Sequence, residues 1–234
     1  MTAVMLQVRL GSSRLPRKAL LPLGGRKVID LVLEALKGID ADMYAVLTDA
    51  GSREGLEESA GKHGFEMFVG PENDVLARYA LAIRRFEPDT VVRATGDNPL
   101  VSAELANMLL QKTGEAGGSV DYAAFDGPPV GTGVEVVRAE SLLRADREAS
   151  DPYSREHVCP YLYRNPDLFR IERYSAPPEY SAPDSPVTLD TEEDYRRIKD
   201  IVASLYDGSP VKTDALVSFL KETGGTGGKT DGTE

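Results

Sequence analysis

The chain has 234 residues, of which 41% are hydrophobic and 28% charged, as in a globular protein that buries one sizeable core. Its net charge of −11 argues against general nucleic-acid binding, which needs a basic surface. No apolar run approaches the roughly 18 residues of a membrane span, so we expect no membrane association. The single cysteine, Cys159, excludes an intramolecular disulfide and a cysteine-based zinc site, and we expect a cytoplasmic protein without a signal peptide.

The first half of the chain alternates strand-like and helix-like segments. Apolar and β-branched runs predict strands over residues 3–10, 43–48, 65–70 and 89–96. Periodic apolar residues predict helices between them over residues 27–38, 52–64 and 74–86. The third helix has Asp74 or Asn73 as its N-cap. This order predicts an α/β fold with a Rossmann-like, mostly parallel (mixed) sheet and helices on both faces.

Past about residue 117 the pattern is less regular. Further strands are predicted over residues 120–125, 133–138, 168–176 and 187–190. Helices are predicted over residues 154–164, where Pro160 interrupts the helix or stands near its start, and 191–206, with Thr191 as N-cap. We expect a single folded domain over residues 1–222 and a flexible, glycine-rich tail over residues 223–234.

A basic loop, residues 8–18, follows the first strand in a stretch without any Asp or Glu before Asp30. In an open α/β sheet, ligands bind outside the carboxyl ends of the strands, where this loop stands. It lacks the spacing of a P-loop and of the dinucleotide fingerprint. A solvated loop is the plainer interpretation, but the concentration of cations around a Gly-Ser-Ser turn favours a pocket for a small phosphorylated ligand.

The spacing R-x-x-S-S-R-x-P-x-K in this loop resembles the amino-terminal signature of the cytidylyltransferases that activate sugars as CMP derivatives. These include the acylneuraminate and 3-deoxy-manno-octulosonate enzymes, and the match is best to the spore-coat polysaccharide (SpsF-like) branch. The resemblance implies the nucleotide-diphospho-sugar transferase (GT-A-like) fold. It also implies that the triphosphate is contacted by Arg9, Arg14 and Lys18. Where the family usually has Gly before this lysine, the chain has Arg17.

Further nucleotide-binding positions follow from the same resemblance. The residues that it implies are Leu10, Gly11, Ser12, Ser13, Asp74 and Arg78. The last two belong to the segment NDVLARY, which resembles a segment of the spore-coat branch. A helix cap and a surface charge explain these two nearly as well.

Two aspartates, Asp97 and Asp190, end predicted strands. Alone, each is explained equally well as a turn or helix-capping residue. Their surroundings, GDNP and LDTEED, resemble the G-D-x-P and D-T-x-E-D motifs of the family, and the resemblance implies that both coordinate Mg²⁺. This agrees with the carboxylate and phosphate oxygens that Mg²⁺ prefers.

Two more segments resemble the acceptor side of the family. PVGTGVEVV offers Glu135 as a polar group for the substrate, and REHVCPYLYRNPDLFRI contains His157. His157 is either a substrate-binding general base or a structural residue of a helix. The resemblance as a whole spans residues 3–206.

The activity that the resemblance implies is transfer of CMP from CTP to a small sugar or sugar-acid hydroxyl with release of pyrophosphate, in a homodimer. A glycosyltransferase of related fold is a first alternative, although no D-x-D motif follows a predicted strand between residues 40 and 130. A catalytically inert nucleotide-binding subunit is a second. An RNA-binding module is a third, and the acidic composition disfavours it.

Overall fold

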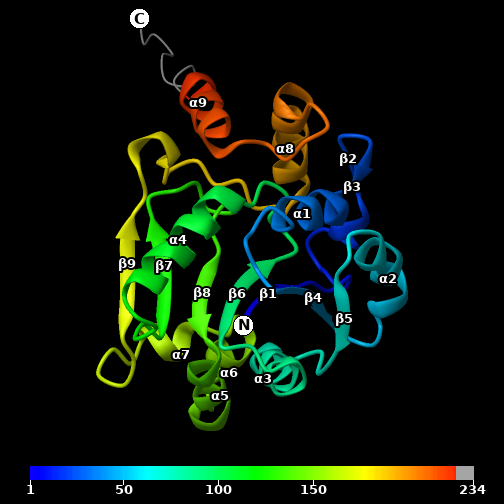
Figure 1. Cartoon of the computed structure of the whole chain (residues 1–234). Coiled ribbons are helices and arrows are strands. Elements are labelled where there is room, and N and C mark those ends of the chain that lie inside the picture. Colours follow the sequence, from blue (N-terminus) through cyan, green and yellow to red (C-terminus); the bar gives the residue numbers. More distant parts are fainter. Residues whose placement is uncertain (225–234) are drawn as a thin grey trace, which may run out of the picture.

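The computed structural model describes residues 1–224, and Figure 1 shows a central sheet between layers of helices. Within these residues the main sheet has the strand order β5-β4-β1-β6-β8-β7-β9. Its strands are β1 (Thr2–Gln7), β4 (Met43–Thr48), β5 (Glu66–Val69), β6 (Thr90–Thr95), β7 (Tyr122–Asp126), β8 (Glu135–Arg138) and β9 (Ile171–Ser175). A separate hairpin consists of β2 (Pro22–Leu23) and β3 (Arg26–Lys27).

The sheet is mixed and mostly parallel, which confirms the predicted α/β class. Strand β1 is parallel to β4 and β6, β4 to β5, and β7 to β9. Strand β8 runs antiparallel to both of its neighbours, β6 and β7. The carboxyl ends of β1, β4 and β6 therefore lie at one edge, where a parallel sheet binds its ligands.

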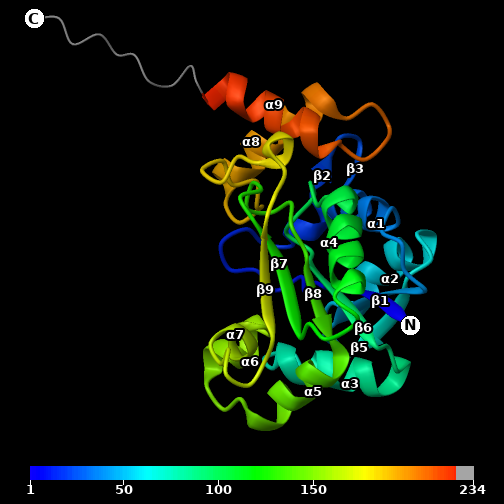
Figure 2. The same cartoon turned by 60° about the vertical axis from the view of Figure 1, so that its left-hand side comes forward.

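Helices cover both faces of the sheet because successive strand residues point to opposite sides. Val4 and Leu6 of β1 join a core with α1, α2, α4, α8 and α9, whereas Ala3 and Met5 join a core with α3, α5 and α7. Figure 2 shows α4 along the face of β7 and β8. The helices are α1 (Val28–Leu36), α2 (Arg53–Lys62), α3 (Val75–Phe86), α4 (Ala103–Glu115), α5 (Ala139–Glu148), α6 (Pro152–His157), α7 (Pro160–Tyr163), α8 (Glu192–Leu205) and α9 (Thr213–Gly224), with the 3-10 helices η1 (Lys18–Leu20) and η2 (Pro178–Tyr180).

Several predicted elements are confirmed with their local signals. The strand predicted over 43–48 is β4, and Asp74 is the N-cap of α3, since its Oδ1 accepts a hydrogen bond from Ala77 N at 2.9 Å. Thr191 caps α8 in a reciprocal capping box with Asp194. Helices α4, α5 and α9 were not predicted.

Of two predictions in the second half of the chain, one is confirmed and one is wrong. The helical stretch over 154–164 is interrupted at Pro160, as predicted, and forms two helices, α6 and α7, because Pro160 carries no N–H and Val158 between them has a φ of 74°. The strand predicted over 187–190 is instead an extended segment without a ladder. Its amides bond instead to loop carbonyls: Val187 N donates to Val130 O and Leu189 N to Asp97 O.

None of the helices within residues 1–224 combines the length and apolar character that a bilayer span requires. The prediction of one domain over residues 1–222 stays a prediction. The tail predicted from residue 223 lies outside the described residues, apart from Thr223 and Gly224, which belong to α9.

Candidate active site

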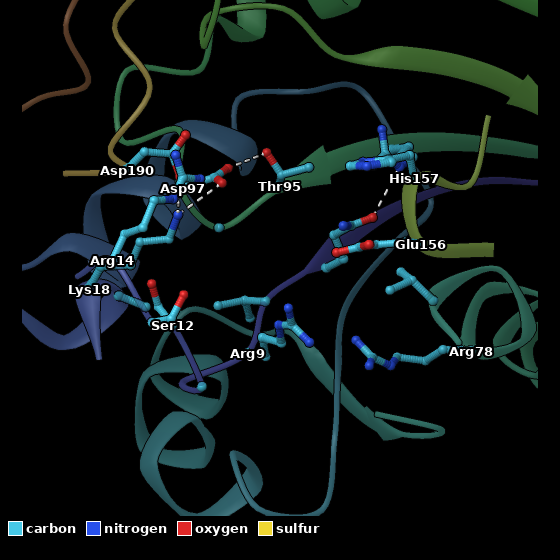
Figure 3. A pocket seen from close by; sticks show the side chains of 18 residues that line it. Arg9, Ser12, Arg14, Lys18, Arg78, Thr95, Asp97, Glu156, His157 and Asp190 are labelled. Carbon is cyan, nitrogen blue, oxygen red and sulfur yellow. Dashed lines mark hydrogen bonds and ion pairs between the residues drawn. The ribbon is translucent and has the colours of Figure 1, made fainter. Parts of the chain in front are cut away.

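A cavity of about 540 Å³ opens at the carboxyl ends of β1 and β6. The two strands are neighbours with Gln7 opposite Thr95, so the loops that follow them leave the sheet side by side. Gly96 N donates to Gln7 O at 2.9 Å, and a Cβ on Gly96 would lie 2.6 Å from the side chain of Val8. Glycine at position 96 therefore allows the basic loop and the loop after β6 to meet (Figure 3).

Most of the predicted site residues line this cavity. They are Arg9, Gly11, Ser12, Ser13, Arg14, Lys18, Arg78, Asp97, His157 and Asp190. Leu10 does not line it and packs against the core instead. Asp74 also lies outside: besides capping α3, its Oδ2 lies 2.6 Å from Arg155 Nη2. The structure thus gathers the basic loop and both aspartates at one place, and the ligand roles of these residues remain predictions.

Lys18 connects the basic loop to both aspartates. Its Nζ lies 3.1 Å from Asp97 Oδ2 and 3.0 Å from Asp190 Oδ1, and it donates to Leu189 O at 2.8 Å. Arg14 Nη2 lies 3.0 Å from the same Asp190 oxygen. The extended segment that the sequence predicted as a strand brings Asp190 here, because Leu189 N bonds to Asp97 O at 2.8 Å.

The two carboxylates suit a hard divalent cation. Mg²⁺ is usually held by one or two carboxylates, with phosphate oxygens and waters in the other positions. Asp97 is oriented by Thr95, whose Oγ1 donates to Asp97 Oδ1 at 2.6 Å. The other oxygen, Oδ2, contacts the ammonium of Lys18, which also contacts Asp190. Residues 1–224 contain no group of three or more His, Cys, Asp or Glu side chains arranged for a metal, so phosphate oxygens and waters would complete the shell.

A second pair of cations faces the cavity without carboxylate partners in the described part of the chain. Arg78 is only 2% exposed and donates to Pro71 O and Glu72 O. Burial lowers its pKa. Figure 3 shows the guanidinium groups of Arg78 and Arg9 pointing toward one another. Because neither side chain forms an ion pair within the described residues, the two cations favour an anionic ligand.

A second, smaller cavity of about 310 Å³ adjoins the first and shares Arg93 and Thr95 with it. Glu135 lines this second cavity, not the first, and forms an ion pair with Arg93. Its other oxygen accepts a hydrogen bond from Tyr122 Oη at 2.8 Å. Burial raises the pKa of Tyr122, and so does the neighbouring carboxylate, so the phenol stays a donor. Glu135 is thus committed to protein partners.

Sequence reasoning missed several residues of the cavity wall. Arg93 had a signal, since it is a charge within the apolar strand TVVRAT, and Gln7 Oε1 accepts from its Nε at 3.0 Å. Nothing in the sequence pointed to Glu156, which precedes His157. Both lie at the end of α6, which Arg155 holds against α3 and α5 through Asp74 and Asp146.

Residues 3–215 match the family model of the cytidylyltransferases. The chain belongs to the cytidylyltransferase family. It is 33% identical over 223 residues to the spore coat polysaccharide biosynthesis protein SpsF of Bacillus subtilis, covering 92% of each chain. It is 28% identical over 247 residues to a 3-deoxy-manno-octulosonate cytidylyltransferase of Polynucleobacter necessarius, covering 86% of this chain and 95% of the relative.

The solved structure of a cytidylyltransferase from Leptospira borgpetersenii superposes on this one with a TM-score of 0.87. It is 28% identical in sequence, and the alignment covers 96% of this chain and 95% of that one. The fold and the family that the sequence motifs implied are thereby confirmed, and the protein is an enzyme of the nucleotidyltransferase class.

Proposed function

We propose that this cytidylyltransferase transfers CMP from CTP to a hydroxyl group of a sugar or sugar acid, with Mg²⁺ as its metal, in the synthesis of surface-polysaccharide precursors. The observation that carries the proposal is the meeting of Lys18 and Arg14 with Asp97 and Asp190 in one cavity. Cations for a triphosphate and carboxylates for a metal are the two requirements of nucleotidyl transfer. The name of the SpsF relative supports the polysaccharide context.

In this reaction the acceptor oxygen attacks the α-phosphorus, the bond from the α-phosphorus to the bridging oxygen breaks so that pyrophosphate leaves, and the hydroxyl proton is released to water. Arg14 and Lys18 would hold the triphosphate and offset the charge of the departing pyrophosphate. Arg9 would add a further cation from the start of the loop. Asp97 and Asp190 would hold Mg²⁺, which when bound offsets phosphate charge and polarises the attacking hydroxyl.

The second cavity is the proposed place of the acceptor, because it meets the nucleotide cavity at Arg93 and Thr95. Its wall is mainly apolar, and Val130 on it is 60% exposed. The wall is held in place, since Val187 N donates to Val130 O at 2.7 Å. Such a surface suits a deoxy or acylated flank of a sugar. His157, on the other side of the nucleotide cavity, would contact the substrate from α6.

Membership of the cytidylyltransferase family argues against the two alternatives that the sequence left, a glycosyltransferase of related fold and a catalytically inert nucleotide-binding subunit. The second would require intact Lys18, Asp97 and Asp190 to serve binding only. A cytoplasmic location and a homodimer are also part of the proposal, and both rest on the family resemblance alone.

The first test needs no acceptor. Thermal unfolding is followed with CTP, UTP, ATP or GTP, each with and without Mg²⁺, because a ligand of the folded state stabilises it by about 2.7 kcal/mol at a hundredfold excess over Kd. We expect the largest shift with CTP and Mg²⁺. Asp97→Asn should lose the Mg²⁺-dependent part of the shift while melting normally without ligand.

The alternatives give different results. A larger shift with UDP- or GDP-sugars than with any triphosphate would favour a glycosyltransferase. A shift with CTP but no pyrophosphate release with any acceptor would favour the inert nucleotide-binding subunit, and no shift with any nucleotide would contradict the proposed function. A CTP-specific shift leads to a screen of sugar acids and N-acylated sugars for pyrophosphate release, in which Asp97→Asn should lose at least about a hundredfold in turnover.

A further inference from the structure

The ammonium group of Lys18 has no hydrogen left for a ligand. A lysine has three N–H donors and no acceptor. Its three partners here are Asp97 Oδ2 at 3.1 Å, Asp190 Oδ1 at 3.0 Å and Leu189 O at 2.8 Å. The side chain is 14% exposed, so water has limited access to it. Before Lys18 can contact a phosphate, it must give up at least one of these three contacts.

The same ammonium stands between the two carboxylates that suit a metal. It contacts one oxygen of Asp97 and one of Asp190, so a cation shared by the two aspartates would come close to the position of Nζ. Like charges repel strongly at such separations in a partly buried site. With Arg14 also on Asp190, two positive groups balance two negative ones, and the cluster as a whole has little attraction for a divalent cation.

A nucleotide triphosphate would change this balance. Arg9 and Arg78 line the cavity, form no ion pair with a carboxylate in the described residues and would attract the anion first. The phosphate oxygens then offer Lys18 new acceptors. Its backbone is held independently, since Leu21 N bonds to Lys18 O at 3.2 Å, so the flexible four-carbon stem can exchange partners without movement of the loop.

We propose that Lys18 closes the metal site in the free protein and that bound nucleotide opens it by drawing the ammonium from the aspartates to the phosphates. This inference rests on the proposed function. It makes nucleotide and metal bind with positive coupling, and the coupling is equal in both directions by thermodynamic linkage. A divalent cation alone therefore binds weakly, and the reactive complex assembles only when both are present.

The test measures metal binding, not turnover. Free Mn²⁺ is titrated by electron paramagnetic resonance against the full chain, with and without CTP and with no acceptor present. The binding of Mn²⁺ to CTP alone is measured and subtracted. We expect wild type to bind Mn²⁺ about tenfold or more tightly when CTP is present. Lys18→Met should bind Mn²⁺ without nucleotide about tenfold or more tightly than wild type does, and the gain on adding CTP should shrink.

Two controls locate the effect. Lys18→Met/Asp97→Asn should lose the tight Mn²⁺ binding, which places the ion at this pair of aspartates. Lys27→Met removes the same charge outside the cavity, where its Nζ pairs with Glu58 at 3.0 Å, and should bind Mn²⁺ as wild type does. If Lys18→Met does not fold, Lys18→Gln carries the same expectation.

Equal Mn²⁺ affinity of Lys18→Met and wild type without nucleotide would overturn the inference. Calorimetry of CTP on the same samples separates this outcome from failure of the proposed function. If CTP binds wild type but the two Mn²⁺ affinities agree, only the role of Lys18 is lost. If CTP does not bind, the proposed function is lost, and the comparison of Mn²⁺ affinities without nucleotide still decides whether Lys18 competes with a metal.

Discussion

Arg78 and Arg93 are two largely buried arginines in the wall of the same cavity, but their partners differ. Arg93 faces the carboxylate of Glu135, whereas Arg78 donates to backbone carbonyls only. Burial opposes the charge of both. Burial lowers the pKa of Arg78. At Arg93 burial is again the largest single cause, but the neighbouring groups, Glu135 first among them, together outweigh it and hold the pKa above its usual range. The protein groups that contact a buried arginine therefore decide what its charge does. The charge is either neutralised by a carboxylate of the protein or stays available to a ligand.

The same contrast separates the two ends of the active site. Near Lys18 the ion pairs are partly exposed, with Asp190 31% and Asp97 27% exposed, and phosphate or metal can replace either partner. Behind the site, Arg93, Glu135, Gln7 and Tyr122 satisfy one another. Ion pairs whose partners can be replaced by a ligand suit a binding site. A network whose polar groups already satisfy one another suits a rigid wall. The following predictions test this comparison in order of expected effect.

The largest effect is expected from Arg93→Met. It leaves Glu135 buried without its cation, which costs about 3–5 kcal/mol of unfolding free energy for a buried pair. Arg93→Met/Glu135→Leu, which removes both charges, should recover most of the loss. Denaturant unfolding of the single and double variants measures both values. A single variant as stable as wild type would show that the pair does not hold the wall.

Arg78→Met should affect stability less than Arg93→Met does and should instead lower the affinity for CTP. It leaves carbonyl groups and not a charge without a partner, so the stability loss is smaller, about 1–3 kcal/mol. The affinity for CTP should fall by about tenfold or more, equal to about 1.4 kcal/mol, because a cation without a carboxylate partner is removed from the cavity. Calorimetry with CTP checks this. Arg53→Met, at an exposed pair with Glu57, should change neither quantity appreciably.

The smallest effect concerns His63, in a cluster away from the cavity. Its Nε2 lies 3.3 Å from Arg26 Nη2 and 3.6 Å from Asp30 Oδ1. Burial lowers the pKa of His63 although Asp30 opposes the shift. The unfolded chain then binds the proton more readily, so the free energy of unfolding should fall as pH drops through the ordinary histidine range near about 6.5.

His63→Gln should flatten this part of the stability profile, measured by chemical unfolding between about pH 7 and pH 5. Parallel profiles of wild type and His63→Gln would contradict the assignment. The nucleotide affinity should be the same in both proteins, because His63 does not line the cavity.

Local signals predicted the parts of the fold that depend on neighbouring residues. The strand β4 and the caps Asp74 and Thr191 follow from hydrophobic runs and from side chains that bond to amides three residues on. The segment 187–190 has the composition of a strand, but its amides find only single loop carbonyls. An extended segment joins a sheet only if another strand lies beside it, and the composition of the segment does not show whether one does.

The candidate site divides in the same way. The basic loop and the two aspartates could be found because each stands in a short motif after a strand-like run. The parallel sheet brings the loop and Asp97 to one edge, and the bond from Leu189 N to Asp97 O brings Asp190 there. Arg93 and Glu135 lie opposite one another because β8 pairs antiparallel with β6, so their ion pair could not be read from the sequence, and the substrate role of Glu135 stays a prediction.

By itself the sequence determined the alternation of strands and helices, the cation-rich loop and the family, since periodicity and motifs are local and need no partner. Only the tertiary structure decided which charged side chains are paired with other protein groups and which remain available to a ligand. Lys18 pairs with Asp97 and Asp190 in the free protein, whereas Arg78 donates to backbone carbonyls alone. The physical reason is that the free energy of a charge depends on what lies within a few ångströms of it, and those neighbours come from distant parts of the chain.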